Sequence, residues 1–204
     1  MSILLPRSNK SNSPFRYPGG KFYARHLILQ YIPEHTHYCE PFAGGASIFF
    51  AKKCWAYTIL NDLDEELMNC YIQIRDNVEE LIRLLDGVPA EKELHHFYKN
   101  NFNPGDDLER AFRWYYLNRT SYSGIMKGEN CYWGYGSKYS MRPENWPPHL
   151  RTVSDRLQGV ELLHNDFETL IEQLDDGFFL FIDPPYYGAD QKKFYRCNFD
   201  YEDH

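Results

Sequence analysis

The chain has 204 residues, of which 43% are hydrophobic and 17% aromatic, so it can bury a full core and is not a disordered segment. Its formal net charge of −7 argues by itself against a nucleic-acid partner, but residues 1–50 (5 basic, 2 acidic) and 110–151 (7 basic, 2 acidic) form two basic stretches. No apolar run is long enough for a signal peptide or a membrane span, and the five scattered cysteines, among them Cys54, contain no C-x-x-C pair. These features favour a reducing cytoplasm and argue against a zinc site or a disulfide framework.

Near the N-terminus, the run SPFRYPGGKFYAR at residues 13–25 places basic and aromatic residues around a Pro-Gly-Gly turn. The basic residues are Arg16, Lys21 and Arg25. Two interpretations remain open. The run is either a basic loop that enters a helix at about residue 22 or a lip that faces the phosphates or bases of a nucleic acid.

The next run, HYCEPFAGGASIFFAKK, predicts a strand at residues 37–40, a turn at Gly44 and Gly45, and a helix from about residue 46. Glycines in such a turn let a ligand approach the backbone, and the start of the helix offers free N–H groups. An ordinary tight turn between a strand and a helix fits equally well. The G-x-G-x-x-G fingerprint of dinucleotide-binding proteins is not met.

The run AYTILNDLDEELMNCYIQIRD repeats this arrangement with a strand at residues 57–60 and a second helix. The residues expected on one face of that helix are Leu63, Leu67, Cys70, Tyr71 and Ile74. Asp62 follows the carboxyl end of the strand, where an acid can hold the ribose hydroxyls of a ligand. One of Asn61, Asp62 and Asp64 is expected to cap the helix, which leaves another for the ligand.

Two further strands are predicted at residues 160–164 and 178–183. Short apolar strands that alternate with helices predict an α/β fold with a doubly wound parallel sheet. Residues 75–155 interrupt the alternation with helical runs and a stretch rich in Gly, Tyr, Trp and Pro. We therefore predict a discontinuous catalytic domain, residues 1–74 and 156–204, and a mostly helical inserted module at residues 75–155.

The last predicted strand runs into Asp183, Pro184, Pro185 and Tyr186. A carboxylate and a carbonyl fixed by a neighbouring proline can each accept a hydrogen bond from one amino group, while an aromatic ring stacks on the base that carries it. Both acceptors would draw the nitrogen toward tetrahedral geometry and free its lone pair to attack a sulfonium methyl group. Positioning and electrostatics then suffice, without a metal or a covalent intermediate.

Five motifs in this order resemble the Dam-type DNA adenine-N6 methyltransferases over nearly the whole chain. They are FRYPGGK, EPFAGGASIFF, NDLDEEL, NRTSYSG and DPPYY. The resemblance implies a Rossmann-like S-adenosylmethionine-dependent methyltransferase sheet with an inserted target-recognition module. It also implies a site-specific enzyme that methylates the N6 amine of a flipped adenine in duplex DNA and releases S-adenosylhomocysteine, in a restriction–modification or phage system.

The resemblance also implies a role for each matching residue. Asp183, Pro184 and Pro185 would hold the target amine, with Tyr186 stacked on the adenine and Lys21 at the mouth of the active site. The residues implied to bind the cofactor are Tyr17, Lys21, Glu40, Phe42, Gly44, Asp62, Asp166, Phe167 and Asp183. For Asp166 and Phe167 a simple helix cap is an alternative interpretation.

Within the inserted module, residues 110–151 combine their positive charge with ten aromatic residues. Basic groups neutralise phosphates, and aromatic groups can reach bases or fill the gap left by a flipped base, although many will simply pack in a core. We expect Arg119, Lys127, Lys138 and Arg142 to contact DNA.

The chain ends 18 residues after Tyr186, and NFDYEDH at residues 198–204 resembles the start of the helix that follows the catalytic strand. The family normally continues with that helix and further C-terminal strands, which are apparently missing here. We therefore expect the cofactor contacts to survive and the activity to be weak or lost. The alternatives are an inactive DNA-binding remnant, or amino-methylation of RNA adenine or of a protein glutamine.

Overall fold

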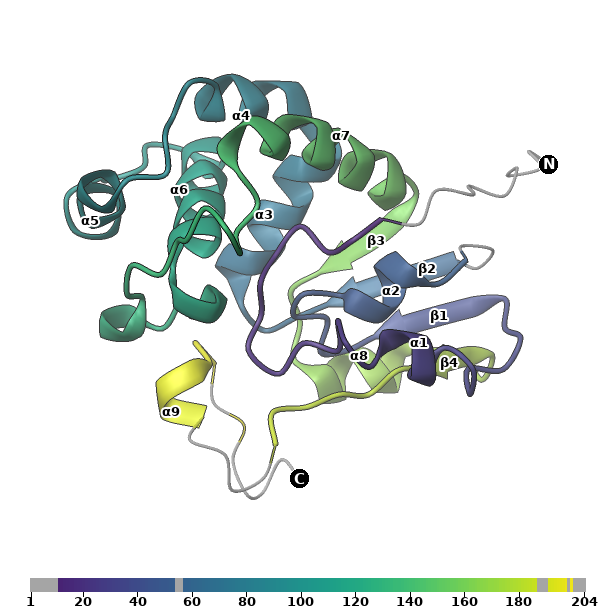
Figure 1. The fold of residues 1–204 in the computed structure, drawn as a ribbon. Helices are drawn as coiled ribbons and strands as arrows, with labels where there is room; N and C mark the ends of the chain where they lie inside the picture. Colours follow the sequence, from purple (N-terminus) through teal and green to yellow (C-terminus); the bar gives the residue numbers. More distant parts are fainter. Residues whose placement is uncertain (1–10, 54–56, 187–190, 198, 200–204) are drawn as a thin grey trace.

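A computed structural model of the chain describes residues 11–53, 57–186, 191–197 and 199 (Figure 1). Cys54 and residues 200–204, where most of the expected C-terminal helix start falls, lie outside the described residues. Among the described helices, none is both long enough and apolar enough to cross a membrane.

Four parallel strands form one sheet in the order β3-β2-β1-β4. The strands are β1 (His37–Glu40), β2 (Tyr57–Asn61), β3 (Val160–Leu163) and β4 (Phe178–Leu180). This arrangement confirms the predicted parallel sheet of an α/β fold. The strand predicted at residues 178–183 is shorter than expected, because after Leu180 only the N–H of Phe181 continues the ladder, by donating to the carbonyl of Cys39 at 2.9 Å.

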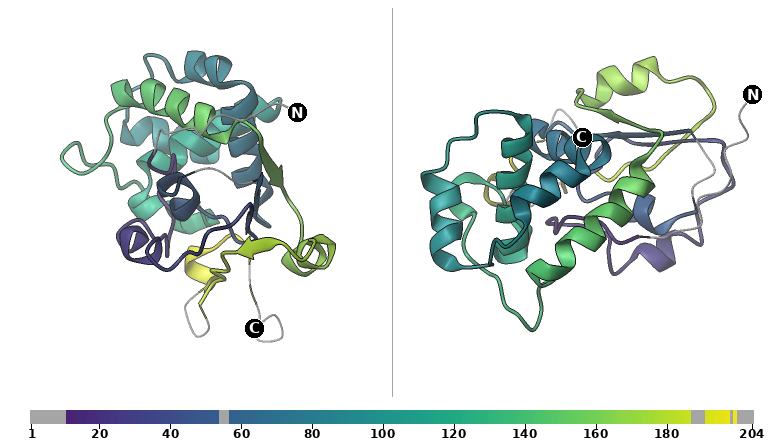
Figure 2. Two further views of the ribbon diagram at one scale, coloured as in Figure 1. Left: turned by 90° about the vertical axis from the view of Figure 1, so that its right-hand side faces the viewer. Right: turned by 90° about the horizontal axis from the view of Figure 1, so that it is seen from above.

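Helices cover both faces of the sheet (Figures 1 and 2). The α-helices are α1 (Arg25–Ile28), α2 (Ser47–Ala51), α3 (Glu65–Asp76), α4 (Val78–Leu85), α5 (Lys92–Asn100), α6 (Asp107–Thr120), α7 (Trp146–Leu157), α8 (Phe167–Gln173) and α9 (Gln191–Phe194). Short 3₁₀ helices are η1 (Tyr122–Gly124), η2 (Gly128–Asn130) and η3 (Pro143–Asn145).

Alternate residues of the strands point to opposite faces, as the pleat of a strand requires. Cys39 and Ile59 pack with Leu170 of α8 on one face, whereas Tyr38 and Leu60 join the larger core on the other. The larger core includes buried residues of α2, α3, α4, α6 and α7. It therefore crosses residue 75, where we predicted the inserted module to begin.

Helix α3 begins at Asp64, whose side chain accepts hydrogen bonds from the N–H groups of Glu66 and Leu67. The predicted apolar face of this helix is confirmed except at Leu63, which precedes the helix and is exposed. Its buried face packs most extensively against α6. Helix α6, in the middle of the predicted inserted module, is in this way joined to the helix that follows β2.

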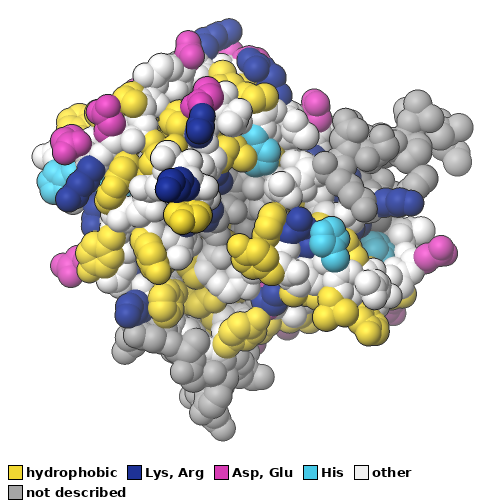
Figure 3. All heavy atoms as spheres, viewed as in Figure 1, with side chains coloured by type: hydrophobic (Ala, Val, Ile, Leu, Met, Phe, Trp, Pro, Cys, Tyr) yellow, Lys and Arg dark blue, Asp and Glu magenta, His cyan; other side chains and the backbone are white. Residues whose placement is uncertain are grey.

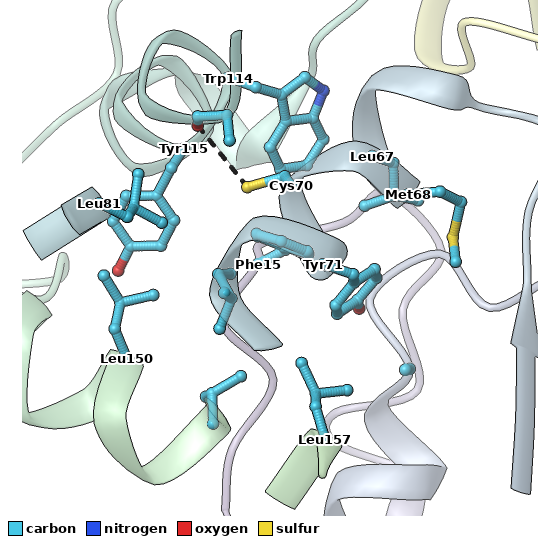
Figure 4. Close-up of a cluster of buried hydrophobic side chains, with 14 of the residues drawn as sticks. Phe15, Leu67, Met68, Cys70, Tyr71, Leu81, Trp114, Tyr115, Leu150 and Leu157 are labelled. Carbon is cyan, nitrogen blue, oxygen red and sulfur yellow. Dashed lines mark hydrogen bonds between the residues drawn. The ribbon is translucent and has the colours of Figure 1, made fainter. Parts of the chain in front are cut away.

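Phe15 carries the N-terminal segment into the same core (Figure 4). Its ring centroid lies 4.6 Å from those of Tyr71 and Trp114, in edge-to-face geometry, and 6.4 Å from that of Tyr115. Tyr71 belongs to α3 and the other two rings belong to α6. Residues 11–21 thus run between the sheet and helix α6.

Candidate active site

A cleft opens at the carboxyl ends of β1, β2 and β4, the edge at which parallel α/β sheets bind ligands. The predicted catalytic and cofactor-binding residues that line it are Tyr17, Lys21, Glu40, Phe42, Gly44, Asp62, Asp166, Phe167, Asp183, Pro184, Pro185 and Tyr186. The structure brings all of these predicted residues together in one site.

The Gly44 turn forms the floor of the cleft. Gly44 has a φ of +46°, and a Cβ atom there would lie 2.9 Å from the ring of Tyr17. Its N–H donates to Asp62 Oδ2 at 2.8 Å, and its carbonyl accepts from the Tyr71 hydroxyl at 2.9 Å. Only glycine fits this crowded left-handed position, and the backbone is held on three sides.

Three polar residues at and just after the end of β2 take different roles. Asp64 caps α3, and the Asn61 side chain donates to the carbonyls of Pro41 and Asn165, both at 3.0 Å. Asp62 faces the cleft, where Oδ1 accepts from the N–H of Asp64 at 3.0 Å and the other oxygen holds Gly44. Burial raises the pKa of Asp62 to about 6. One acid caps the helix, as predicted, and another faces the cleft.

Glu40 is a second buried carboxylate, at the end of β1. Its Oε1 accepts from the Tyr38 hydroxyl at 2.7 Å and from the Phe49 N–H at 2.8 Å. Burial raises the pKa of Glu40 to about 7, although these hydrogen bonds oppose the shift. Two buried carboxylates beside an open cleft suit a ligand that carries positive charge.

Aromatic rings line the far side of the cleft. The ring centroids of Phe42 and Phe167 lie 5.1 Å apart, and Phe199 lies 5.4 Å from each. Asp166 accepts from the Glu168 N–H at 2.9 Å and so caps α8, the alternative role considered for it. A planar heterocycle can stack on such rings.

The sequence did not single out three lining residues, Tyr195, Cys197 and Phe199. They come after residues 183–186 in the chain and line the same cleft, and Arg196 between them pairs with Asp64 at 3.1 Å. The sequence feature that could have pointed to them is the presence of aromatic residues after Pro184 and Pro185.

At the other end of the cleft, Lys21 Nζ lies 2.6 and 2.5 Å from the two oxygens of Asp183. The same ammonium donates to the Gly19 carbonyl at 3.0 Å and lies 4.9 Å from the ring centroid of Tyr186. Burial by itself would lower the pKa of Lys21, but the hydrogen bonds to Asp183 and Tyr186 raise it. A nitrogen is therefore held between the carboxylate and the aromatic ring.

The four basic residues expected to contact DNA are placed differently. Lys138 and Arg142 are exposed, and Lys127 is half-buried with its ammonium 3.3 Å from the carbonyl of Arg196. On the face drawn in Figure 3, basic side chains lie among hydrophobic ones. Arg119 is 6% exposed and its guanidinium donates to the Pro14 carbonyl at 3.4 Å, so its expected contact with DNA is not supported by its position.

No group of three or more His, Cys, Asp or Glu side chains in the described part of the chain is arranged as a metal site.

The chain is similar to proteins of known activity. A sequence model described as D12 class N6 adenine-specific DNA methyltransferase matches residues 17–204. The chain is 29% identical to "Type II methyltransferase M1.LlaDCHI" of Lactococcus lactis subsp. cremoris, over 98% of this chain and 76% of that protein. It is 30% identical to "Type II methyltransferase M.MjaIII" of Methanocaldococcus jannaschii, over 85% of this chain and 68% of that protein. It is 31% identical to the "DNA N-6-adenine-methyltransferase" of Escherichia phage P1, over 90% of this chain and 25% of that protein.

Proposed function

Because this chain belongs to the D12 class of N6 adenine-specific DNA methyltransferases, we propose that its cleft holds S-adenosylmethionine at the Gly44 end and a flipped adenine at the Asp183 end. The observation that carries this proposal is the position of the Lys21 ammonium, between the carboxylate of Asp183 and the ring of Tyr186. A nitrogen of the target base would find the same acceptor and the same ring there.

The residues at the Gly44 end fit the proposed methyl donor. The backbone approaches closely at Gly44, Asp62 keeps lone pairs for ribose hydroxyls, and the rings of Phe42 and Phe167 offer faces for the adenine. The carboxylates of Glu40 and Asp62 complement a cationic ligand. When bound, S-adenosylmethionine supplies an electrophilic methyl group on its sulfonium and becomes S-adenosylhomocysteine.

At the other end, Asp183 and the carbonyl of Pro184 accept the two N–H groups of the adenine amine. These hydrogen bonds draw the nitrogen out of conjugation with the ring, so its lone pair becomes available for a new N–C bond. Asp183 is placed to take the proton that the nitrogen then loses. Tyr186, which is 52% exposed, holds the base flat against its ring.

The inserted module, residues 75–155, serves target recognition in this proposal, and residues 1–74 and 156–204 serve methyl transfer. Lys138 and Arg142 are exposed cations suited to phosphates, and Tyr122, Tyr132 and Tyr139 are exposed rings suited to bases. The enzyme would act on duplex DNA in the cytoplasm.

The proposal is tested by incubating the chain with labelled S-adenosylmethionine and duplex DNA, and by mapping N6-methyladenine in the product. The wild-type chain should label DNA, and Asp183→Asn should lower the rate by about 10²–10³-fold, because the amide lacks the negative charge that stabilises the reacting nitrogen and cannot take its proton. Asp176→Asn removes an exposed acid just before β4 and should keep the wild-type rate. A wild-type chain that labels RNA or protein but not DNA would overturn the proposal.

A further inference from the structure

Residues 118–121, the first four of the NRTSYSG stretch, lie inside the protein rather than on a DNA-facing surface, whereas Tyr122 and Ser123 are exposed. Asn118, Thr120 and Ser121 are 0% exposed, and Arg119 is 6% exposed. These residues end α6, and the backbone beyond them turns through left-handed conformations at Ser123 and Gly124. Asn118, Arg119 and the Ser121 carbonyl have partners in the N-terminal segment, whereas the Thr120 hydroxyl pairs with His95 at 2.8 Å.

Asn118 binds the backbone of Arg16 through both ends of its amide. Its Oδ1 accepts from the N–H of Arg16 at 3.0 Å, and its Nδ2 donates to the carbonyl of Arg16 at 2.8 Å. Nδ2 also lies 3.4 Å from the carbonyl of Gly124. One side chain of the inserted module therefore satisfies both backbone groups of a residue 102 positions away, as a neighbouring strand would.

Further contacts near Asn118 hold the same part of the N-terminal segment, residues 14–16. Arg119 has no carboxylate within ion-pair distance among the described residues, and the Pro14 carbonyl is the partner of its guanidinium. The guanidinium of Arg16 donates to the Ser121 carbonyl at 3.3 Å. Gly124 has a φ of +72°, and a Cβ atom there would lie 2.1 Å from the Arg16 carbonyl oxygen, so the two backbones touch.

The residues that follow Arg16 reach both ends of the cleft. Tyr17 packs on the glycine turn. A Cβ atom added at Gly45 would lie 3.2 Å from the Cβ atom of Tyr17. Lys21 binds Asp183, five residues beyond the point held by Asn118. Phe15, the residue before Arg16, is buried in the core (Figure 4). A displacement at Arg16 would therefore be passed to the cofactor turn and to the catalytic acid.

We propose that Asn118 and Gly124 are positioning residues for methyl transfer, which act by clamping Arg16 and so holding Tyr17 and Lys21 in the cleft. This inference rests on the proposed function and adds to it a role for the inserted module inside the active site. The module holds the reacting groups in register, in addition to any contact with DNA.

The chain offers a matched pair of glycines for the test. Gly124→Ala adds a Cβ atom against Arg16, whereas Gly159→Ala adds one at nearly the same φ, +74°, with no atom within 4 Å. Both changes carry the same backbone strain, but only the first pushes on the clamp. We expect Gly124→Ala to lower kcat, measured per folded molecule, by about 100-fold and to raise the Kd for S-adenosylhomocysteine by about tenfold. Gly159→Ala should keep both kcat and Kd near their wild-type values.

Trypsin provides a readout that does not depend on activity. Cleavage after Arg16 or Lys21 should become rapid in Gly124→Ala and stay slow in Gly159→Ala, because only the first releases the segment. If the two variants share kcat, Kd and cleavage rate once matched for the folded fraction, the proposed clamp is wrong. A wild-type chain that fails to methylate DNA would overturn the proposed function, while the Kd and the cleavage pattern would still decide on the clamp.

If Gly124→Ala does not fold, a second pair of variants, Asn118→Ser and its control Asn69→Ser, tests the proposed clamp by the same measurements. Asn118→Ser removes the clamp, and Asn69→Ser removes a similarly buried amide that donates to the Asp107 carbonyl at 2.9 Å, away from the segment. We expect similar shifts in Tm for both variants and a loss of kcat for Asn118→Ser alone. An equal loss in both would mean that Asn118 serves stability only.

Discussion

Lys21 and Asp183, 162 residues apart in the chain, meet across the cleft with the ammonium 2.6 and 2.5 Å from the two carboxylate oxygens. Their side chains are 19% and 23% exposed, so solvent screens the pair only in part. The ammonium fills the place that we assign to the target amine. Binding of a flipped base therefore requires the Lys21 ammonium to move off Asp183, while the backbone of Lys21 keeps its place at the cleft. Until the base binds, the ion pair holds the acid in position.

Tyr186 should act through its ring rather than its hydroxyl. Tyr186→Ala is expected to lower kcat/KM by about 10- to 100-fold, because stacking on a base contributes roughly 1–3 kcal/mol. Tyr186→Phe keeps the ring and should stay within about threefold of wild type. Steady-state rates on duplex DNA measure both changes, and a loss of equal size in the two variants would rule out stacking as the role of this residue.

Asp62 should control affinity for the cofactor through the Gly44 turn. The two oxygens of Asp62 accept hydrogen bonds from the backbone N–H groups of Gly44 and Asp64. Asp62→Asn replaces one oxygen with an NH₂ group, which cannot accept, so at least one of these two hydrogen bonds is lost. We expect the Kd for S-adenosylhomocysteine to rise by about 10- to 100-fold in calorimetry. Asp106→Asn, at the cap of α6 away from the cleft, should stay near wild type, since Asn caps a helix as well as Asp does. Equal affinities in the two variants would contradict this assignment.

Glu40 should make the stability of the protein depend on pH. Its folded-state pKa of about 7 lies above the ordinary value of 4.5, so the folded protein binds the extra proton between these values. The contribution to the free energy of unfolding is full below pH 4.5 and is lost as the pH rises through 7. Relative to Glu40→Gln, the wild type should lose roughly 3 kcal/mol between pH 5 and pH 8.

Urea unfolding at the two pH values measures this difference. The comparison with Glu40→Gln is needed because Asp62, with a pKa of about 6, shifts the wild-type curve in the same direction. Parallel curves for the two proteins would show that Glu40 is not the group responsible.

The salt dependence of DNA binding should separate the exposed cations from Arg119. Lys138→Gln and Arg142→Gln should each reduce the slope of log Kobs against log[salt] by about 0.9, because each releases one fewer counterion. Arg119→Gln should leave the slope unchanged and lower Tm, since its guanidinium is buried against Pro14. Arg83→Gln, an exposed change on α4 outside the cleft, serves as the control. An unchanged slope for both Lys138 and Arg142 would move the DNA interface elsewhere.

The positions of Asp62 and Asp183 could be predicted because each follows an apolar strand, and parallel strands end at one edge of a sheet. The end of β4 could not, since Phe181 and Ile182 continue the apolar run although the strand has already ended at Leu180. Apolar runs in the sequence locate the strands, whereas pairing determines where each strand stops.

Arg119 shows a different limit. Its charge and its basic, aromatic surroundings predicted a surface contact, but its exposure depends on the packing of Pro14, 105 residues earlier in the chain. Phe199 was missed for a similar reason, because only the fold of the chain brings it to Phe42 and Phe167. Periodicity and propensity describe neighbours in sequence and carry no information on such long-range contacts.

The clamp between Asn118 and Arg16 has a consequence for making chimaeras of this enzyme with its relatives. Recombination at the predicted borders of the inserted module would take Asn118 from one parent and leave Arg16 to the other. The two halves of a single hydrogen-bonded contact would then come from different proteins. A graft intended to change which DNA sequence is methylated should therefore carry residues 13–21 together with the module, so that Asn118 and Arg16 come from the same parent.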